Sequence, residues 1–172
     1  MPGAGKSTIA AGLQKKGFES INMGDAVRAE AKKRNLEPTG QNLGKLMLEL
    51  REKNGQGAVA ELIKDQIINS KSDVVVIDGV RSNAEIEVLK KIATVKLLSI
   101  HASTSTRYNF LNTRKRTDDP PDRGTFDERD SREIGVGISA SIALADESIS
   151  NNNLTIEQLI ETTYNTIKKW LA

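Results

Sequence analysis

The first eight residues contain a run suited to binding phosphate. Gly3-Ala4-Gly5-Lys6-Ser7-Thr8 matches the second half of the pattern G-x-x-x-x-G-K-[ST], in which backbone N–H groups surround phosphate oxygens. In such a loop the lysine bridges the terminal phosphates, the serine hydroxyl ligates Mg²⁺, and the following helix directs its positive dipole end at the site. We therefore predict that the chain binds ATP and Mg²⁺. The predicted nucleotide-binding residues are Pro2, Gly3, Ala4, Gly5, Lys6, Ser7 and Thr8.

A flexible, glycine-rich N-terminus is the alternative interpretation of this run. The context favours the phosphate loop, because an amphipathic helix with Ile9 and Leu13 follows and Gly17 ends it. The first glycine of the pattern would precede Met1, and the central strand that leads into such loops has no counterpart. About five apolar residues of that strand would contribute roughly 8–15 kcal/mol, which rivals the whole stability of a domain. We therefore expect that the sequence is short at its N-terminus.

An acidic residue follows the clearest strand signal in the chain. Val74-Val75-Val76-Ile77 is apolar without alternation, which is typical of a parallel strand covered on both faces. Asp78 ends this run, where it could hold Mg²⁺ through water. An aspartate can instead cap the next helix, but Gly79-Val80-Arg81 follows directly and a cap alone would not require the arginine. The predicted metal-side residues are Ser7 and Asp78.

Short β-branched runs alternate with longer amphipathic segments, and this pattern predicts an α/β protein with a parallel sheet. We expect strands at about 20–22, 73–78, 95–101 and 147–150. We expect helices at about 6–16, 25–35, 43–53, 58–69, 84–92, 103–116, 126–144 and 155–171, the last one capped by Thr155. Two prolines and Gly124 predict a mobile loop at 117–125.

The composition limits the remaining possibilities. A length of 172 residues suits one domain, and the absence of cysteine excludes disulfides, thiolate metal sites and cysteine nucleophiles. No apolar run approaches the roughly 20 residues of a membrane span, and the start has no signal-peptide pattern, so we expect a cytoplasmic protein without a membrane partner. The net charge is +2, with acids and bases interleaved, which does not favour a nucleic-acid partner.

Several motifs resemble those of nucleotide kinases. Gly24-Asp25-Ala26-Val27-Arg28 resembles a segment of adenylate kinases whose arginine meets the acceptor's phosphate, and Asp78-Gly79-Val80-Arg81 resembles their Asp-Gly-Phe-Pro-Arg without its proline. Arg116-Thr117-Asp118-Asp119 resembles the lid signature of nucleoside monophosphate kinases. Residues 145–151, with Leu154 and Leu159 after them, resemble the C-terminal end of dephospho-coenzyme A kinases. Over nearly its full length the chain is similar to an archaeal group of adenylate-kinase-related proteins.

This resemblance implies a P-loop kinase domain over residues 1–172, with the three-layer fold of nucleoside monophosphate kinases. It implies a five-stranded parallel sheet, of which this chain would lack the first, central strand. An acceptor-side helical region would cover about 25–70 and a lid about 114–132. The implied catalytic residues are Lys6, Arg81, Arg116 and Arg129, with Arg114 and Arg132 as further lid candidates. The implied substrate-binding residues are Asp25, Arg28 and Arg81. Beyond Arg81 the acceptor pattern of adenylate kinases is absent, which does not favour AMP in particular.

The predicted function is therefore transfer of the γ-phosphoryl of ATP to a nucleotide-like, phosphorylated small molecule. One alternative is a nucleotide-dependent switch or ATPase that acts on a protein or RNA partner, and another is an inactive, truncated relative. The arginines of the lid could also belong to an ordinary solvated face, paired with nearby acids. His101, the only histidine, is interpreted as structural. No Asn-Lys-x-Asp guanine motif is present, and the sequence predicts no oligomeric state.

Overall fold

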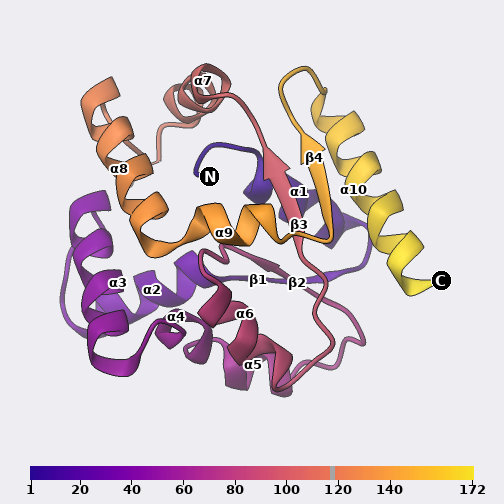
Figure 1. The fold of residues 1–172 in the computed structure, drawn as a ribbon, viewed down its shortest axis with the longest axis horizontal. Coiled ribbons are helices and arrows are strands. Elements are labelled where there is room, and N and C mark those ends of the chain that lie inside the picture. Colours follow the sequence, from indigo (N-terminus) through magenta and orange to yellow (C-terminus); the bar gives the residue numbers. More distant parts are fainter. Residues whose placement is uncertain (117–118) are drawn as a thin grey trace.

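The computed structural model describes residues 1–116 and 119–172, so Thr117 and Asp118 of the predicted lid signature lie outside the described residues. Helices and strands alternate along the chain as predicted (Figure 1). The helices are α1 (Lys6–Lys15), α2 (Met23–Lys33), α3 (Gly40–Asn54), α4 (Ala58–Glu61), α5 (Lys64–Ile68), α6 (Asn83–Lys90), α7 (Thr104–Arg114), α8 (Arg123–Val136), α9 (Ile138–Ala143) and α10 (Ile156–Leu171). The strands are β1 (Glu19–Asn22), β2 (Val75–Asp78), β3 (Leu98–His101) and β4 (Glu147–Ser150).

The strands form two parallel pairs rather than the five-stranded sheet that the resemblance implies. β1 pairs with β2, so that Asn22 lies opposite Asp78, and β3 pairs with β4. As predicted, β2 is covered on both faces, because Val75 and Ile77 pack against one apolar cluster and Val76 packs against another, although all three side chains are only partly buried. Among the described residues β2 has a strand neighbour on one edge only, and that leaves part of its surface uncovered.

Helix starts follow the local sequence closely. Thr155 caps α10 as predicted, because its side chain accepts the N–H of Gln158 and the Gln158 side chain accepts the N–H of Thr155. Ser82 and Glu85 form the same reciprocal pair at the start of α6. Since Ser82 caps α6, Asp78 is not the N-cap of that helix, and the alternative interpretation of Asp78 was wrong.

Two segments that were predicted as single helices are interrupted. Gly137, at φ +110°, separates α8 from α9, and only glycine adopts this conformation without strain. The segment 58–69 is divided into α4 and α5 at Ile63. Its N–H donates to the carbonyl of Ala60, a bond of the 3₁₀ type, and its side chain is completely buried.

Two apolar clusters hold the elements together. One joins β1 and β2 to α2, α3, α4 and α6, with Met23, Leu46 and Ile63 fully enclosed. The other joins α1, β3, β4 and α10, and Trp170 of α10 packs against it. Figure 1 shows α10 running beside β4, with α7 above β3 and α8 to the left of that strand. Within the described residues, no helix is both long enough and apolar enough to span a membrane.

Candidate functional site

The loop before α1 has the backbone shape that its glycines predict. Gly3 and Gly5 have φ values of +78° and +101°, and a Cβ at Gly3 would lie 2.7 Å from the carbonyl oxygen of Arg107. A Cβ at Gly5 would lie 2.7 Å from the amide nitrogen of Asn151. That amide donates to the carbonyl of Ala4 at 3.1 Å, so the β4–α10 connection holds the loop from behind. Other residue types would be both strained and too large at these two glycines.

Lys6 begins α1 and lies inside the structure. Its Nζ donates to the carbonyl oxygen of Met1 at 2.8 Å. Burial lowers the pKa of Lys6 from its ordinary value of 10.5, while the carboxylate of Asp78 opposes that shift and the guanidinium of Arg81 adds to it. An anionic group placed beside this ammonium would favour its charged form and oppose the lowering of its pKa.

Ser7 and Asp78 meet at the end of β2, where a magnesium site was predicted. The Ser7 hydroxyl donates to Oδ2 of Asp78 at 3.2 Å, and the side-chain amide of Asn22 donates to the same oxygen at 2.9 Å. No group of three or more His, Cys, Asp or Glu side chains suited to a metal occurs in the described part of the chain. Mg²⁺ commonly uses one or two protein ligands together with waters and substrate phosphates. A hydroxyl beside one buried carboxylate fits that requirement.

A cavity of about 1030 Å³ opens beside the loop. Ligand pockets commonly measure about 300–1,000 Å³, so this cavity has room for a nucleotide and a second small molecule. It brings together most of the predicted site residues, namely Pro2, Gly3, Gly5, Lys6, Ser7, Thr8, Arg28, Asp78, Arg81, Arg116 and Arg129. Asp25 and the buried Ala4 do not line it, and neither does His101, which is exposed at the end of β3.

Arg81 is fixed by two glutamates of different elements. Its backbone N–H donates to Oε2 of Glu85 at 2.7 Å, and Glu85 is itself fully buried and paired with Arg51 of α3 at 2.6 Å. The Arg81 side chain reaches the other way, where its Nε lies 2.5 Å from the carboxylate of Glu133 on α8. Arg81 therefore connects the end of β2 to α8, most of which lies within the predicted lid.

The lid arginines face one buried aspartate. Asp119 forms an ion pair with Arg114 and lies 3.8 Å from Arg129, and only 4% of its side chain is exposed. The same carboxylate accepts the backbone N–H of Arg116 at 2.9 Å. The side chains of all three arginines line the cavity. The alternative of an ordinary solvated face fits Arg114 and Arg116, which are exposed, and Arg123, which is half-exposed and paired with Asp127, whereas only 17% of the Arg129 side chain is exposed.

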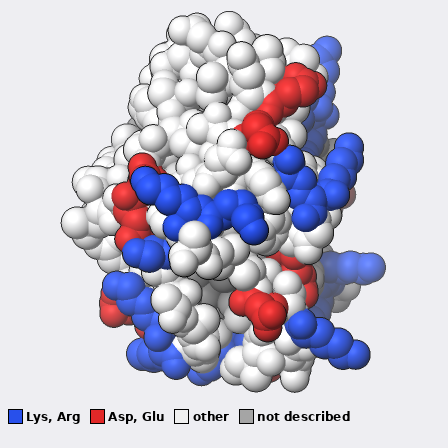
Figure 2. Space-filling view, turned by 90° about the vertical axis from the view of Figure 1, so that its right-hand side faces the viewer, with Lys and Arg blue, Asp and Glu red and all other residues white. Residues whose placement is uncertain are grey.

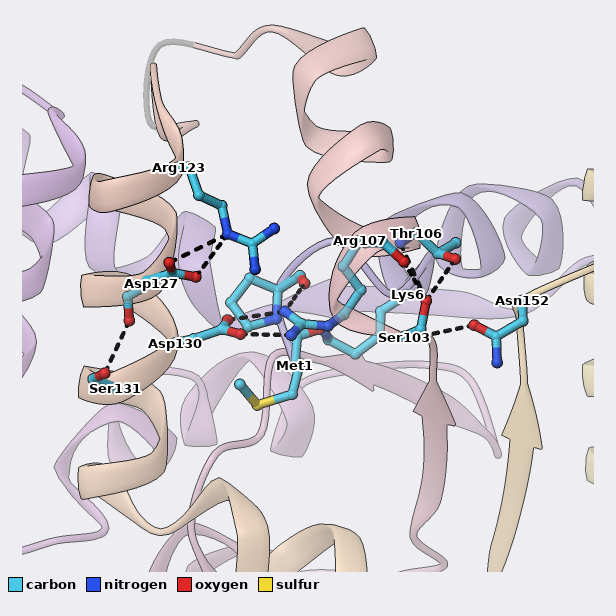
Figure 3. Close-up of polar contacts among 12 residues, drawn as sticks. Met1, Lys6, Ser103, Thr106, Arg107, Arg123, Asp127, Asp130, Ser131 and Asn152 are labelled. Atoms are coloured by element: carbon cyan, nitrogen blue, oxygen red, sulfur yellow. Dashed lines mark hydrogen bonds and ion pairs between the residues drawn. The ribbon is translucent and has the colours of Figure 1, made fainter.

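Sequence reasoning missed the ion pair that supports the loop. Arg107 of α7, only 4% exposed, binds both carboxylate oxygens of Asp130 on α8, at 2.9 and 2.5 Å. It also donates to the carbonyl oxygen of Pro2 at 3.1 Å. Figure 3 shows its guanidinium between Asp130 and Met1, with Lys6 close by. This one side chain joins both lid helices to the phosphate loop.

Only a weak signal for this pair exists in the sequence. Asp130 lies three residues after Asp127 on the same helix, and nothing in the sequence tells which of the two carboxylates points inward. Asp130 faces inward to Arg107, whereas Asp127 pairs with exposed Arg123 at 3.0 Å. Charged residues dominate α8, so an apolar stripe that would mark its inner face is missing from its sequence.

Comparison with known protein families agrees with this geometry. A family model described as an AAA domain matches residues 1–124. A UPF0200 protein of Hyperthermus butylicus is 39% identical over 158 residues, which cover 92% of this chain and 84% of the relative. UPF0200 proteins of Pyrococcus abyssi and Methanococcus maripaludis are 40% and 39% identical, over 89% and 98% of this chain and 84% and 94% of the relatives. With its phosphate loop, its acidic partner Asp78 and these relatives, the chain belongs to the archaeal UPF0200 family and has a nucleotide-binding P-loop fold.

Proposed function

We propose that the protein is a small-molecule kinase that transfers the γ-phosphoryl of ATP to a phosphorylated, nucleotide-like acceptor in the cytoplasm. The observation that supports this most is the cavity shared by the phosphate loop, Asp78 and six arginines from three parts of the chain. These arginines are Arg28, Arg81, Arg114, Arg116, Arg129 and Arg132. A kinase must neutralise the phosphates of both ATP and the acceptor, whereas a site that only binds or hydrolyses ATP neutralises one set and needs fewer cations.

The nucleotide would bind at the α1 end of the cavity. Backbone N–H groups of residues 3–8 and the N-terminus of α1 would hold its phosphates, and Lys6 would leave the Met1 carbonyl to reach them. Ser7 and Asp78 would hold Mg²⁺, which neutralises charge on the phosphate oxygens. The base would lie between Phe110 of α7 and Ile156 of α10, since both line the cavity and are 42% and 59% exposed.

The acceptor would bind at the opposite end, beside α2 and α3. Transfer breaks the bond between the γ-phosphorus and the bridging oxygen, forms a bond to an acceptor oxygen and releases ADP. The protein contributes position and charge, because phosphoryl transfer needs little covalent help. Arg28 and Arg81 would hold the acceptor, and Arg116 and Arg129 would approach the transferred group from the lid. Arginine suits these roles because its planar fork binds phosphate oxygens in pairs and stays charged.

We also propose that the active protein has a further parallel strand between β2 and β3 that leads into the phosphate loop. The support is that β2 and β3 each pair on one edge only among the described residues. Val76 of β2 also packs against the apolar cluster of β3 and β4, so the two pairs already share a core. A strand there would pair with both edges and cover the half-buried side chains of β2.

Two other functions remain as alternatives to be tested. A switch or ATPase would keep the phosphate loop and Asp78 without an acceptor pocket, and an inactive relative would not bind ATP at all. The face drawn in Figure 2 does not favour an RNA partner, because its Lys and Arg side chains lie beside Asp and Glu side chains. Basic patches that bind nucleic acid are normally not interrupted by acids in this way.

The test is a screen for ADP release that depends on an acceptor. ATP·Mg²⁺ would be mixed with each nucleoside monophosphate and with dephospho-coenzyme A, both for this chain and for a form extended by an apolar strand before Met1. The proposal expects one acceptor to raise ADP release and to appear as a phosphorylated product. ADP release without any response to an acceptor would support the ATPase, and no ATP binding by either form would support the inactive relative.

Substitution of Arg81 separates the kinase from the ATPase. Arg81→Ala should abolish acceptor-dependent ADP release, whereas an ATPase would keep its turnover. Arg81→Lys keeps a cation beside the buried Glu133 and so controls for folding, yet it should also lose most of the transfer because lysine lacks the planar fork. Arg34→Ala is the matched control, since Arg34 pairs with Glu30 and Glu49 away from the cavity.

A further inference from the structure

The side chain of Arg132 on α8 packs against α3 at Gly44, and we call this contact the Arg132 seat. A Cβ built at Gly44 would lie 2.5 Å from Nη1 of Arg132 and 2.7 Å from its Cζ, so the guanidinium rests directly on the backbone of α3. Gly44 is buried in the middle of that helix, where glycine is unfavourable compared with alanine. A side chain at position 44 would therefore stabilise the helix itself but would collide with the guanidinium of Arg132.

Within the described parts of the chain, no carboxylate balances the charge of Arg132. Its Nε is buried without a hydrogen-bond partner, and no hydrogen bond or ion pair involves its side chain within residues 1–116 and 119–172. The neighbouring arginines differ, because Arg81 is paired with Glu133 and Arg129 lies near Asp119. Buried polar groups almost always have a partner, and a cation held in place without one marks a site for an anion.

The position of Arg132 indicates which anion it would meet. Arg132 lines the cavity together with Leu43 and Met47 of α3 and Val80 after β2. These residues lie on the acceptor side, away from the residues that contact α1 and α10. Their apolar side chains would pack against the body of a small molecule, while the guanidinium would take a charged group at its end. The cation surplus in the cavity favours a doubly charged phosphate over a carboxylate.

We propose that Arg132, seated on Gly44, forms the phosphate-binding subsite that selects the acceptor. This inference rests on the proposed kinase function and adds Arg132 to the residues that would hold the acceptor's phosphate. Arg81 is held by Glu133 before the acceptor arrives, whereas the guanidinium of Arg132 lies against Gly44 without an ion pair among the described residues and is available to the acceptor's phosphate. Arg132 is therefore a specificity-determining residue, and an analogue without the phosphate would bind much more weakly.

Gly44→Ala tests the seat without removing any charge. The added methyl group would occupy the space of the guanidinium tip, and the flexible Arg132 side chain would move away. Alanine also favours the helix, so the variant should fold at least as well as the unmodified chain. Gly135→Ala is the matched control, because Gly135 is exposed on α8 and a Cβ there meets nothing within 4 Å.

The measurement uses protein with ¹⁵N-labelled arginine and follows the Nε–H signals by NMR while inorganic phosphate is added. Arg132→Lys identifies the Arg132 signal by its loss. We expect this signal to shift and saturate in the unmodified chain and in Gly135→Ala. In Gly44→Ala it should require roughly 10- to 100-fold more phosphate, as expected for the loss of one charge-assisted contact. An unmoved Arg132 signal in the unmodified chain, or equal behaviour of the two alanine variants, would overturn the proposal.

Addition of ADP·Mg²⁺ to the same samples separates this inference from the proposed function. If ADP·Mg²⁺ does not bind while the Arg132 signal still responds to phosphate, the kinase proposal fails and the anion subsite stands. If ADP·Mg²⁺ binds and the Arg132 signal ignores phosphate, the subsite is refuted and the kinase proposal survives. Lys6→Met provides a further check, since phosphate bound only at the loop would no longer be seen, whereas the Arg132 response should persist.

Discussion

Replacement of Asp130 by alanine would leave the buried guanidinium of Arg107 without its carboxylate. Both oxygens of Asp130 bind Arg107, whose side chain is 5% exposed. Removing one partner of such a buried pair commonly costs 3–5 kcal/mol, since the remaining charge stays out of water. Asp130 itself is 13% exposed, and Arg107 keeps its bond to Pro2 and its contact with the Phe126 ring. The lower end, about 3 kcal/mol, is therefore the expected loss.

That loss converts into a shift that thermal unfolding resolves easily. For a chain of this size each kcal/mol changes Tm by about 2–4 °C, so Asp130→Ala should melt about 6–12 °C lower. Asp127→Ala is the matched control on the same helix, because Asp127 pairs with Arg123 (Figure 3) and both side chains are more than half exposed. Exposed pairs contribute about 0–1 kcal/mol, so the control should change Tm by no more than about 4 °C. Equal Tm values for the two variants would refute the role assigned to Arg107.

Two further substitutions test the electrostatics of the loop. Lys6→Met removes an ammonium whose pKa is lowered mainly by burial, so without ligand its Tm should equal or exceed that of the unmodified chain. In the unfolded chain Lys6 keeps its proton up to about pH 10.5, whereas in the folded chain its pKa is lower. The free energy of unfolding of the unmodified chain should therefore rise relative to that of Lys6→Met as the pH increases toward 10.5. A difference between the two proteins that stays constant with pH in denaturant titrations would contradict this. Asp78→Asn keeps an acceptor for Ser7 and Asn22 but loses the charge, so ATP binding should need roughly 10–100-fold more Mg²⁺ at an unchanged Tm. Unaltered Mg²⁺ dependence would remove Asp78 from the metal site.

The sequence predicted those parts of the site that depend on neighbouring residues. The phosphate loop and its helix need only the glycine spacing and Lys6, and the capping pair Thr155–Gln158 needs only a three-residue separation. β4 was expected at 147–150 and lies at Glu147–Ser150. Asp78 was placed beside Ser7 because parallel strands of this fold end at the phosphate loop, a rule that applies before any packing is known.

The parts that could not be predicted depend on packing between distant elements. Whether a charged residue of α8 faces Arg107, Arg81 or solvent is decided by the rotation of the helix, and α8 has too few apolar residues to fix that rotation in its sequence. The burial of β2 depends in the same way on which strands lie beside it. Gly44 was the only local hint of the Arg132 seat, since a glycine inside a helix usually has a packing reason.

Binding of ATP, measured by titration calorimetry with and without Mg²⁺, tests the central claim most directly. The phosphate loop, Ser7 and Asp78 together predict saturable binding of one ATP per chain that requires Mg²⁺. Lys6→Met should weaken this binding by roughly 10–100-fold through the loss of a charge-assisted contact, while its fold is kept. Absence of binding in the presence of Mg²⁺, or equal affinity for the unmodified chain and Lys6→Met, would contradict the assignment of this cavity as a nucleotide site.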